Sequence, residues 1–311
     1  MKAIVLNAPG GVDQLEYQDF DIPTIQDGEV LVKVKAISIN PVDVKSRAGH
    51  GMYGMLKDFR PLILGWDISG VVEETKSDKF KVGDAVFGMV NFPGHGKAYA
   101  EYVAAPAAHL ALKPANIDFN EAAATTLVAL TAWQALVENG KVQKGQKVLI
   151  HAASGGVGHI AVQIAKYLGA EVTGTSSEKN KDFVLSLGAD HHIDYHNYDW
   201  IAQKREFDFV LDTIGGNNID NSLAVTKEGG TVISIPSGLN ENVTEKAKAL
   251  GVNGYFILVH SNGKQMQQIA DLLTNGTIKT TIAQKFPFSQ MREAHLQQET
   301  ARTVGKIIVE L

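Results

Sequence analysis

The chain has 311 residues, of which 44% are hydrophobic and 20% charged, and its formal net charge is −5 at pH 7. These values are ordinary for a globular protein and exclude disordered and fibrous classes, while the length suits two domains with separate cores. The sequence holds no cysteine, which excludes disulfides, thiolate zinc sites and cysteine nucleophiles.

Charge and hydropathy also constrain partners and location. The 29 basic residues form no run that favours nucleic acid or an anionic membrane surface. No apolar stretch approaches the roughly 20 residues that a bilayer requires, and the first residues lack the apolar region of a signal peptide. We therefore expect a soluble, cytoplasmic protein that acts on a small molecule, without nucleic-acid or membrane partners.

The first third of the chain is rich in short, strand-like runs. Residues 30–37 alternate and are β-branched, and runs at 68–73 and 85–88 follow, separated by Gly, Pro and Asp. Short strands separated by such turns predict a small β-barrel.

From residue 118 the pattern becomes helical and then alternates between strand and helix. Residues 118–139 carry Ala, Leu and Val at helical spacing, with Asp118 or Asn120 as the N-cap and Gly140 as the stop. The alternation that follows predicts a parallel sheet with helices on both faces. The predicted strands are 147–151, 171–175, 207–212 and 231–235, and the predicted helices are 157–168, 180–187 and 264–273.

Strand-like segments of the barrel type return at 286–288 and 306–311. The expected α/β architecture is therefore a doubly wound parallel-sheet domain at 121–280, inserted into a β-barrel domain made of 1–120 and 281–311.

A glycine-rich turn at 152–158 lies between a predicted strand and a predicted helix, the setting of a dinucleotide site. A glycine lets the backbone approach a pyrophosphate, and the helix N-terminus offers unpaired N–H groups with positive partial charge. We expect Ser154, Gly155, Gly156 and Val157 to hold the cofactor, while Gly158 packs the helix against the strand. A structural turn that binds nothing is the alternative.

The end of the second strand of this domain distinguishes the two nicotinamide cofactors. An NAD site usually places a carboxylate there for the ribose hydroxyls, whereas this chain has Thr175 and Ser176, then Glu178 and Lys179. Hydroxyls and an ammonium suit a 2′-phosphate. NADPH is therefore favoured over NADH. Two alternatives remain: a shift of one residue in the strand end would let Glu178 reach the ribose, and Lys179 is alternatively a solvated lysine at a helix start.

The sequence resembles the medium-chain dehydrogenase/reductase superfamily, and within it the zinc-free quinone oxidoreductase branch. The matching stretches span nearly the whole chain, from Asn-Pro-Val-Asp at 40–43 through the glycine turn to Gly-Lys-Ile-Ile-Val at 305–309. The resemblance implies a GroES-like barrel plus a Rossmann domain, with the active site in the cleft between them.

The resemblance also implies roles for individual residues. It places Thr131 near the nicotinamide, Tyr195 near the 2′-phosphate, and Thr213 and Ser237 in loops after later strands. It places Phe256 and Leu258 beside the nicotinamide. The segment 251–258 reads as an edge strand that pairs with its two-fold mate in relatives, so a homodimer is expected.

Zinc is not expected, because the three positions that carry the catalytic metal's ligands in zinc-dependent members hold Asn40, Trp66 and about Leu127. An amide, an indole and an isobutyl group do not together bind zinc. None of the histidines, such as His151, His191, His192 and His196, pairs with a carboxylate in the zincin manner.

Without a metal, reduction of a conjugated acceptor is favoured over reduction of a simple ketone, because the charge spreads into an enolate or hydroquinone oxygen that hydrogen-bond donors support. Asn40, whose motif position faces the nicotinamide in relatives, is the expected donor, although capping of the following helix is an alternative. Tyr53 is a second catalytic candidate or else a solvated loop tyrosine. Trp66 and Phe92 are expected to line the substrate pocket.

The sequence therefore predicts NADPH-dependent, zinc-independent hydride transfer to quinones or α,β-unsaturated carbonyls. Two alternatives remain open at this stage. One is a zinc-free alcohol or aldehyde reductase, and the other is a protein that binds NADPH without turnover.

Overall fold

The computed structural model describes residues 1–239 and 242–311, which form two compact units. Unit 1 comprises Met1–Leu130 and Val259–Leu311, and unit 2 comprises Thr131–Leu258.

The unit boundaries fall at 130/131 and 258/259 instead of the expected 120/121 and 280/281. The second shift has a local cause, because helix α8 (Gly263–Thr274) packs against β7 (Leu110–Leu112) of unit 1. At the start of α8 a Cβ on Gly263 would lie 2.4 Å from the Ala108 carbonyl oxygen, so the contact requires glycine.

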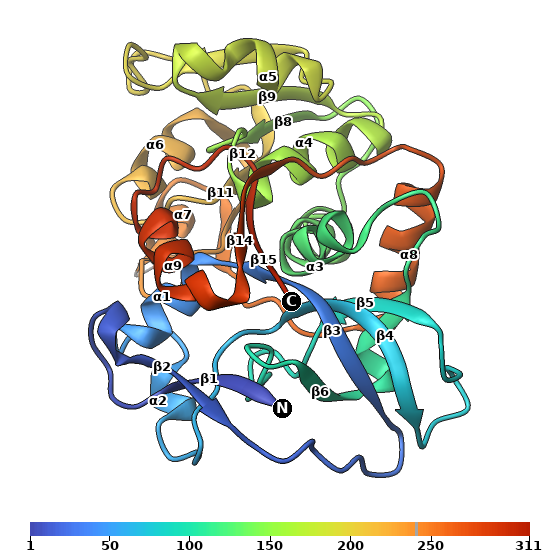
Figure 1. The fold of residues 1–311 in the computed structure, drawn as a ribbon. Coiled ribbons are helices and arrows are strands. Elements are labelled where there is room, and N and C mark those ends of the chain that lie inside the picture. The colour runs from blue at the N-terminus through green and yellow to red at the C-terminus, as the bar shows by residue number, and fades with distance from the viewer. Residues whose placement is uncertain (240–241) are drawn as a thin grey trace. The chain divides into compact units, whose positions relative to one another are not determined.

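Unit 2 is built on six parallel strands in the order β10-β9-β8-β11-β12-β13. Its strands are β8 (Lys147–Ile150), β9 (Glu171–Ser176), β10 (His191–Asp194), β11 (Phe207–Asp212), β12 (Thr226–Ser234) and β13 (Asn253–Phe256). Its helices are α4 (Gly156–Tyr167), α5 (Lys181–Ser186), α6 (Asn218–Val225) and α7 (Val243–Ala249), with 3-10 turn η4 (Glu178–Asn180). The strand order reverses between β8 and β11, which confirms the doubly wound fold. In Figure 1, α4 and α5 lie against the β8 and β9 region of this sheet.

The centre of this sheet follows directly from the sequence. Val148, Leu149 and Ile150 of β8 are each 0% exposed, as expected for a parallel strand covered on both faces. Leu149 packs with Val210 and Val232 of the neighbouring strands in one apolar cluster. Apolar side chains thus hold the sheet together and leave the loops at its edges for ligands.

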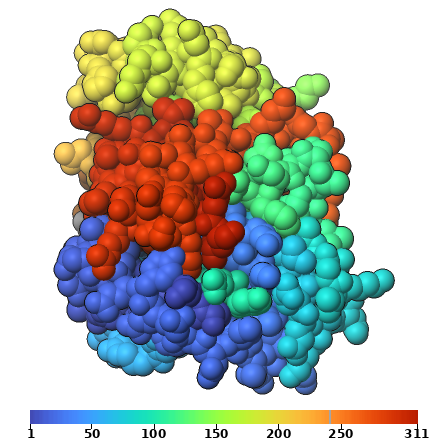
Figure 2. Space-filling view, viewed as in Figure 1, coloured from blue at the N-terminus to red at the C-terminus, as the bar shows by residue number. Residues whose placement is uncertain are grey.

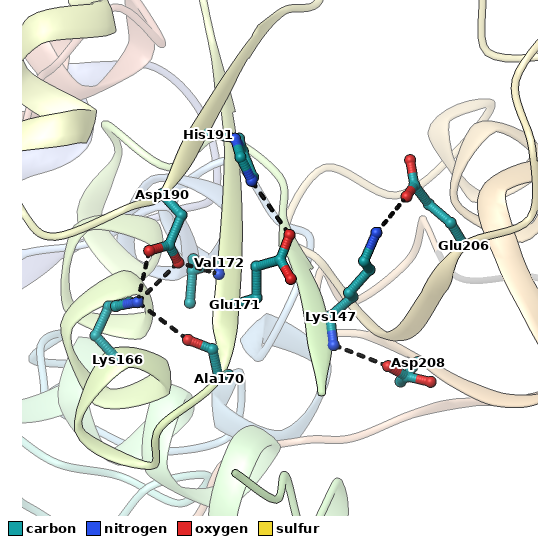
Figure 3. A network of polar contacts seen from close by, with 9 residues as sticks. All are labelled: Lys147, Lys166, Ala170, Glu171, Val172, Asp190, His191, Glu206 and Asp208. Carbon is teal, nitrogen blue, oxygen red and sulfur yellow. Dashed lines mark hydrogen bonds and ion pairs between the residues drawn. The ribbon is translucent and has the colours of Figure 1, made fainter. Parts of the chain in front are cut away.

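Polar contacts pin the amino-terminal edge of the sheet (Figure 3). Lys147 donates its N–H to Asp208 at 2.8 Å, and its ammonium pairs with Glu206 at 2.7 Å. The Asp190 carboxylate joins the Lys166 ammonium to the backbone of β9, because it accepts the Val172 N–H at 2.7 Å. The charged side chains at this edge therefore stabilise the unit through contacts with one another and with the backbone.

Unit 1 contains a seven-stranded sheet and a two-stranded sheet. Its strands are β1 (Lys2–Leu6), β2 (Leu15–Asp19), β3 (Glu29–Ile39), β4 (Asp67–Thr75), β5 (Ala85–Met89), β6 (Tyr102–Pro106), β7 (Leu110–Leu112), β14 (Ile282–Pro287) and β15 (Lys306–Glu310). Its helices are α1 (Pro41–Arg47), α2 (Tyr53–Leu56), α8 and α9 (Met291–Glu299), with most of α3 (Phe119–Trp133) and the 3-10 turns η1 (Val12–Gln14), η2 (Ala107–His109) and η5 (Phe288–Gln290).

Strand β3 organises unit 1 because it is long enough to serve several partners. It pairs with β4 along most of its length, with β6 over Glu29–Lys33, and with β15 over Ala36–Ile39. The strands expected at 30–37, 68–73 and 85–88 are confirmed as β3, β4 and β5. Together with β14 and β15, they form the GroES-like unit.

Both ends of the chain contribute to unit 1. The Arg292 Nε group of α9 donates to the Leu15 carbonyl at 2.9 Å, and Figure 2 shows the red α9 segment beside the dark blue N-terminal residues. Within residues 1–239 and 242–311, no helix is long and apolar enough to cross a membrane.

Helix α3 begins as predicted but ends differently. Asp118 Oδ1 accepts the Glu121 N–H at 2.7 Å and Glu121 Oε2 accepts the Asp118 N–H at 2.9 Å, which is a capping box. Asp118, not Asn120, is therefore the cap. The last part of the expected helix, Gln134–Asn139, is a π-helical turn before Gly140. A Cβ on Gly140 would lie 2.3 Å from the Phe209 ring, so the chain passes close to β11 there.

Candidate functional site

The glycine turn lies between β8 and α4, as predicted. Its first residue, Ala152, has a φ of 46°, a left-handed conformation that is uncommon for a residue other than glycine. Backbone contacts hold the turn against β9, because Ala153 donates its N–H to the Thr175 carbonyl at 2.8 Å. Gly155 then caps α4 without a side-chain hydrogen bond. The turn is therefore a shaped backbone surface and not a loose connection.

The two glycines of this turn have different tasks. A Cβ on Gly158 would lie 2.2 Å from the Ala152 carbonyl oxygen, so this position requires glycine for helix packing. A Cβ on Gly155 would meet only that same oxygen, at 3.2 Å, and the space beyond it is open. The first turn of α4 leaves the N–H groups of Gly156, Val157 and Gly158 without partners inside the helix. The residues present therefore fit a pyrophosphate.

The carboxyl ends of all six strands meet at one edge of a parallel sheet, and the expected cofactor residues follow them. Ser154 to Val157 follow β8 and Lys179 follows β9. Tyr195, Thr213 and Ser237 follow β10, β11 and β12, while Phe256 is the last residue of β13 and Leu258 comes after it. In doubly wound folds, ligands bind at this edge, where the strand order reverses. The expected cofactor residues of unit 2 lie at this edge apart from Thr131, which is buried in α3, and Thr175 and Ser176, which lie within β9.

Glu178 and Lys179, in the turn after β9, have different surroundings. The Glu178 carboxylate faces Lys181 at 3.3 Å and His192 at 3.9 Å. Lys179 is exposed, and in the described part of the chain its ammonium has no ion-pair partner. The side chain of Asn180 donates to Ser154 Oγ at 3.2 Å, which ties this turn to the glycine turn. Of Glu178 and Lys179, Lys179 is therefore the one whose charge has no ion-pair partner among the described residues.

Two expected phosphate donors are corrected by the structure. The Thr175 side chain is 0% exposed, and its hydroxyl accepts the Ala152 N–H at 3.2 Å. The Ser176 hydroxyl is also buried, and it contacts the Ser177 carbonyl at 3.0 Å and His192 Nε2 at 2.8 Å. Because β9 extends to Ser176, both hydroxyls lie inside the unit and stabilise the turns instead of facing a ligand.

Tyr195 and Thr213, two other members of the expected set, lie at the carboxyl ends of strands. Tyr195 is 47% exposed and its N–H contacts the Ser176 carbonyl at 3.3 Å, so it stands beside the end of β9. Thr213 donates its hydroxyl to the His151 carbonyl at 2.8 Å, which leaves it at the ends of β8 and β11.

In unit 1, Asn40 is 0% exposed and both ends of its amide are engaged. Its Nδ2 donates to Asp67 Oδ2 at 2.8 Å and to the Ser38 carbonyl at 3.4 Å, and its Oδ1 accepts from the Lys306 ammonium. Both amide hydrogens are thus used inside the unit. The expected role of Asn40 as donor to a substrate or cofactor is therefore corrected to an internal bridge.

The alternative role for Asn40, capping of helix α1, is supported by one of its backbone contacts. The Asp43 carboxylate accepts the Asn40 N–H at 2.7 Å at the start of α1, where Pro41 occupies the first turn.

Trp66 and Phe92 contact each other, with ring centroids 5.1 Å apart in an edge-to-face arrangement. Trp66 is 1% exposed and donates its indole N–H to the Gly94 carbonyl at 2.7 Å. The backbone N–H of Leu127 donates to Asp67 Oδ1 at 3.1 Å. Asn40, Trp66 and Leu127, at the three zinc-ligand positions, therefore make hydrogen bonds within the unit. The Lys306 ammonium at Asn40 Oδ1 would also repel a metal cation. Zinc does not fit these residues.

The histidines considered as metal ligands have separate surroundings. His151 is buried, its Nδ1 lies 3.3 Å from Thr175 Oγ1, and burial lowers its pKa to about 4. His191 faces Glu171 at 3.2 Å. Over residues 1–239 and 242–311, no three His, Asp or Glu side chains are grouped so that they could hold a metal ion.

A buried polar chain in unit 1 was not anticipated from the sequence. Arg47 contacts His295 Nδ1 at 3.5 Å, and His295 Nε2 lies 2.9 Å from the Tyr99 hydroxyl. Because arginine only donates, Nδ1 accepts and Nε2–H donates, so that Tyr99 donates onward to the Asp43 carboxylate. Glu299 pairs with Arg47 at the other end.

Burial dominates the acid–base behaviour of this chain. It raises the pKa of Asp43 to about 7, with a further contribution from Asp67, and it lowers the pKa of His295 to about 3. No local pattern marks these residues, because they lie on separate segments of the sequence.

Tyr53 opens helix α2, and its ring is partly buried. In the described residues its hydroxyl has no hydrogen-bond partner, in contrast to Asn40. Of the two catalytic candidates, Tyr53 is therefore the one whose polar group remains available.

The two units together define an α/β protein with a GroES-like unit and a dinucleotide-binding sheet. Residues 26–115 match the model of the alcohol dehydrogenase GroES-like domain, and residues 187–309 match the model described as zinc-binding dehydrogenase.

Individual relatives narrow the class. The chain is 34% identical over 321 residues to the NADPH-dependent alkenal/one oxidoreductase, chloroplastic, of Arabidopsis thaliana, covering 99% of this chain and 79% of that protein. It is 30% identical to the human quinone oxidoreductase, covering 95% and 93%. The quinone oxidoreductase structure from Coxiella burnetii superposes with a TM-score of 0.94 at 36% identity, covering 100% of this chain and 99% of that chain.

The chain therefore belongs to the medium-chain dehydrogenase/reductase superfamily, in its branch of quinone oxidoreductases and alkenal reductases. Its relatives are NAD(P)H oxidoreductases.

Proposed function

We propose that this protein transfers hydride from NADPH to quinones or α,β-unsaturated carbonyl compounds without a metal. The observation that carries the choice of NADPH is the exposed Lys179 beside the end of β9, with the neighbouring Glu178 turned to Lys181 and His192. A cation suits the 2′-phosphate, whereas NAD sites place a carboxylate at this point.

The residues of unit 2 would hold the cofactor along the carboxyl edge of the sheet. The backbone N–H groups at Gly156 and Val157 would bind the pyrophosphate, and Lys179 and Tyr195 would bind the 2′-phosphate. Thr213, Ser237 and the segment after β13 continue the same edge toward the nicotinamide. When bound there, NADPH supplies the hydride.

The preference for conjugated acceptors rests on the donors that unit 1 offers. Reduction of a saturated ketone requires strong stabilisation of an alkoxide, usually by a metal or a Tyr/Lys pair. The residues at the zinc-ligand positions do not fit a metal, and Asn40 is committed to Asp67 and Lys306. We assign the Tyr53 hydroxyl to the substrate oxygen, where a single donor supports the spread charge of an enolate or hydroquinone. Names of relatives, such as alkenal/one oxidoreductase and quinone oxidoreductase, support the same substrate classes.

A steady-state screen tests this function. NADPH oxidation would be followed with 1,4-benzoquinone, 9,10-phenanthrenequinone, acrolein, longer 2-alkenals and saturated ketones, and then repeated with NADH. We expect turnover with quinones or enones and a higher kcat/KM with NADPH. Reduction of saturated ketones at comparable rates would favour the alcohol or aldehyde reductase instead. Tight NADPH binding without oxidation by any acceptor would favour a binding protein.

We further propose a homodimer formed through β13, which pairs with β12 on one side and ends the six-stranded sheet. A free edge offers unpaired backbone groups to a second copy. Light scattering should give twice the mass of one chain. Asn253→Lys should shift the mass toward the monomer, because a lysine on an edge strand disfavours pairing with a second copy; an unchanged dimer would place the interface elsewhere. The expected cytoplasmic location stays a prediction, since relatives carry chloroplastic or mitochondrial in their names.

A further inference from the structure

A lysine ammonium lies inside unit 1, at the start of the last strand. The Lys306 residue is 3% exposed. Its Nζ donates to the Ile39 carbonyl at 2.8 Å and also to Asn40 Oδ1. A buried ammonium is costly unless opposite charge and hydrogen bonds compensate it, so its partners indicate what it does.

The negative charge that compensates Lys306 is on Asp67, and the side chain of Asn40 lies between the two. The amide oxygen of Asn40 faces the Lys306 ammonium, and its Nδ2 donates to Asp67 Oδ2 at 2.8 Å. The amide dipole therefore lies between a cation and an anion, with each end facing the charge that attracts it. Opposite charges at the two ends define the orientation of this amide, which an uncharged environment would leave free to flip.

The carboxylate continues the connection into a helix. Asp67 Oδ1 accepts the backbone N–H of Leu127 at 3.1 Å, and Asp67 is 0% exposed. The chain of contacts thus joins the start of β15, the junction of β3 with α1, the start of β4 and the middle of α3. Four elements that are distant in sequence meet at one buried cation and one buried anion.

A second buried acid, Asp43, lies close to Lys306 and Asp67. Asp43 faces Lys306 and Asp67 electrostatically, and Tyr99 lies beside Asp43. Burial raises the pKa of Asp67 to about 6 and lowers that of Lys306 to about 8, in each case against the attraction between the two. The orientation of the bridging amide, with its oxygen toward Lys306 and its nitrogen toward Asp67, fits a cation at one end and an anion at the other.

We propose that Lys306 is a positioning residue for the reaction: with Asn40 and Asp67 it forms a charge–dipole–charge brace that holds the β3–α1 junction and α3 in their catalytic arrangement. The proposal rests on the reductase function proposed above. The Lys306 ammonium is buried and is not proposed to touch substrate or cofactor. A purely stabilising contact would affect unfolding alone, whereas a positioning residue affects kcat in protein that remains folded.

The test uses Lys306→Met, Asp67→Asn and the double variant, measured for free energy of unfolding, NADPH dissociation constant, kcat and KM. Lys285→Met is the matched control, because Lys285 lies on the neighbouring strand β14 and forms a half-exposed pair with Glu310 at 3.4 Å. Lys306→Met leaves a buried carboxylate uncompensated and should lower stability more than the double variant does. Lys306→Arg keeps the charge and should retain part of the activity.

We expect kcat to fall at least about tenfold in Lys306→Met and in the double variant, which corresponds to about 1.4 kcal/mol in the barrier. The NADPH dissociation constant should stay within about twofold, because unit 2 is unchanged. Lys285→Met should match the wild type.

Two results would overturn the proposal. One is a double variant that regains both stability and kcat, which would make the brace structural only. The other is an unchanged kcat in folded Lys306→Met. Absence of turnover in the wild type with every acceptor would instead refute the proposed function, and with it the catalytic role of Lys306; non-additive stabilities in the cycle would still establish the brace itself.

Discussion

The side-chain amide of Asn180 donates a hydrogen bond to the Ser154 hydroxyl at 3.2 Å, and so joins the turn after β9 to the glycine turn after β8. In a doubly wound fold, the glycine turn binds the pyrophosphate, and the turn after the next strand, here β9, binds the ribose of the adenosine. Because one hydrogen bond connects them, the two recognition elements are held at a constant separation. Substitutions in either turn should therefore act on cofactor affinity before they act on the reaction.

Lys179→Ala should weaken NADPH binding by about tenfold and leave NADH binding unchanged, because only NADPH carries the 2′-phosphate. Fluorescence titration of both cofactors measures this. Lys204→Ala is the control, since Lys204 is also exposed but lies in the loop before β11. Equal losses for NADPH and NADH would contradict the assignment of Lys179 to the phosphate.

The two glycines of the turn should separate stability from affinity. Gly158→Ala places a Cβ 2.2 Å from the Ala152 oxygen and should lower the free energy of unfolding by about 2 kcal/mol or more. Gly155→Ala meets that oxygen only at 3.2 Å and should be tolerated in the apoprotein, while weakening NADPH binding. Denaturant unfolding and cofactor titration on both variants measure the two effects. The reverse order would refute a pyrophosphate at Gly155.

Tyr53→Phe should lower kcat with enones by about tenfold or more and leave the NADPH dissociation constant unchanged, since a lost donor to the developing oxyanion acts in the transition state. Tyr167→Phe is the control, because Tyr167 is 55% exposed on α4. An unchanged kcat would mean that solvent alone supports the oxyanion and supplies the proton.

Asp43→Asn should remove part of the pH dependence of stability. Burial raises the pKa of Asp43 from 3.8 to about 7, so the folded protein binds this proton more tightly than the unfolded chain does. The resulting stability is fully present below pH 3.8 and is lost as the pH rises through about 7. The stability difference between wild type and Asp43→Asn should therefore shrink from pH 4 to pH 7.

Urea unfolding across this range measures the effect of Asp43. Asp67 titrates in the same direction and Lys306 in the opposite direction at higher pH, which is why the difference between the two proteins is the quantity to follow. A difference that is constant with pH would show that Asp43 is ionised throughout.

The sequence predicts those features that depend on neighbours along the chain. Alternation over 30–37 predicts β3, and the apolar run before the glycine turn predicts β8, because each strand is buried in a pattern that its own residues display. The strand predicted at 231–235 begins earlier, at Thr226, and passes through Gly229 and Gly230 with a register shift opposite β11.

Side-chain assignments failed where long-range contacts decide the outcome. Thr175 was expected to face the phosphate, but its orientation depends on the strand continuing to Ser176 and on the Ala152 N–H. Asn40 was expected to act as a donor, and only the arrival of Lys306 and Asp67 from elsewhere in the chain reveals that its amide is occupied. A polar residue's motif position predicts where it lies and not what it is bonded to.

The pairing of β3 with β15 has a consequence for the order in which the protein assembles. Asn40 and Lys306 are separated by 266 positions, and the whole of unit 2 lies between them. During synthesis, the continuous segment 131–258 is available for folding while unit 1 still lacks the strand that compensates Asp67. Because Lys306 is among the last residues to be synthesised, unit 1 can complete its buried charged contacts only after the whole of unit 2 has been made.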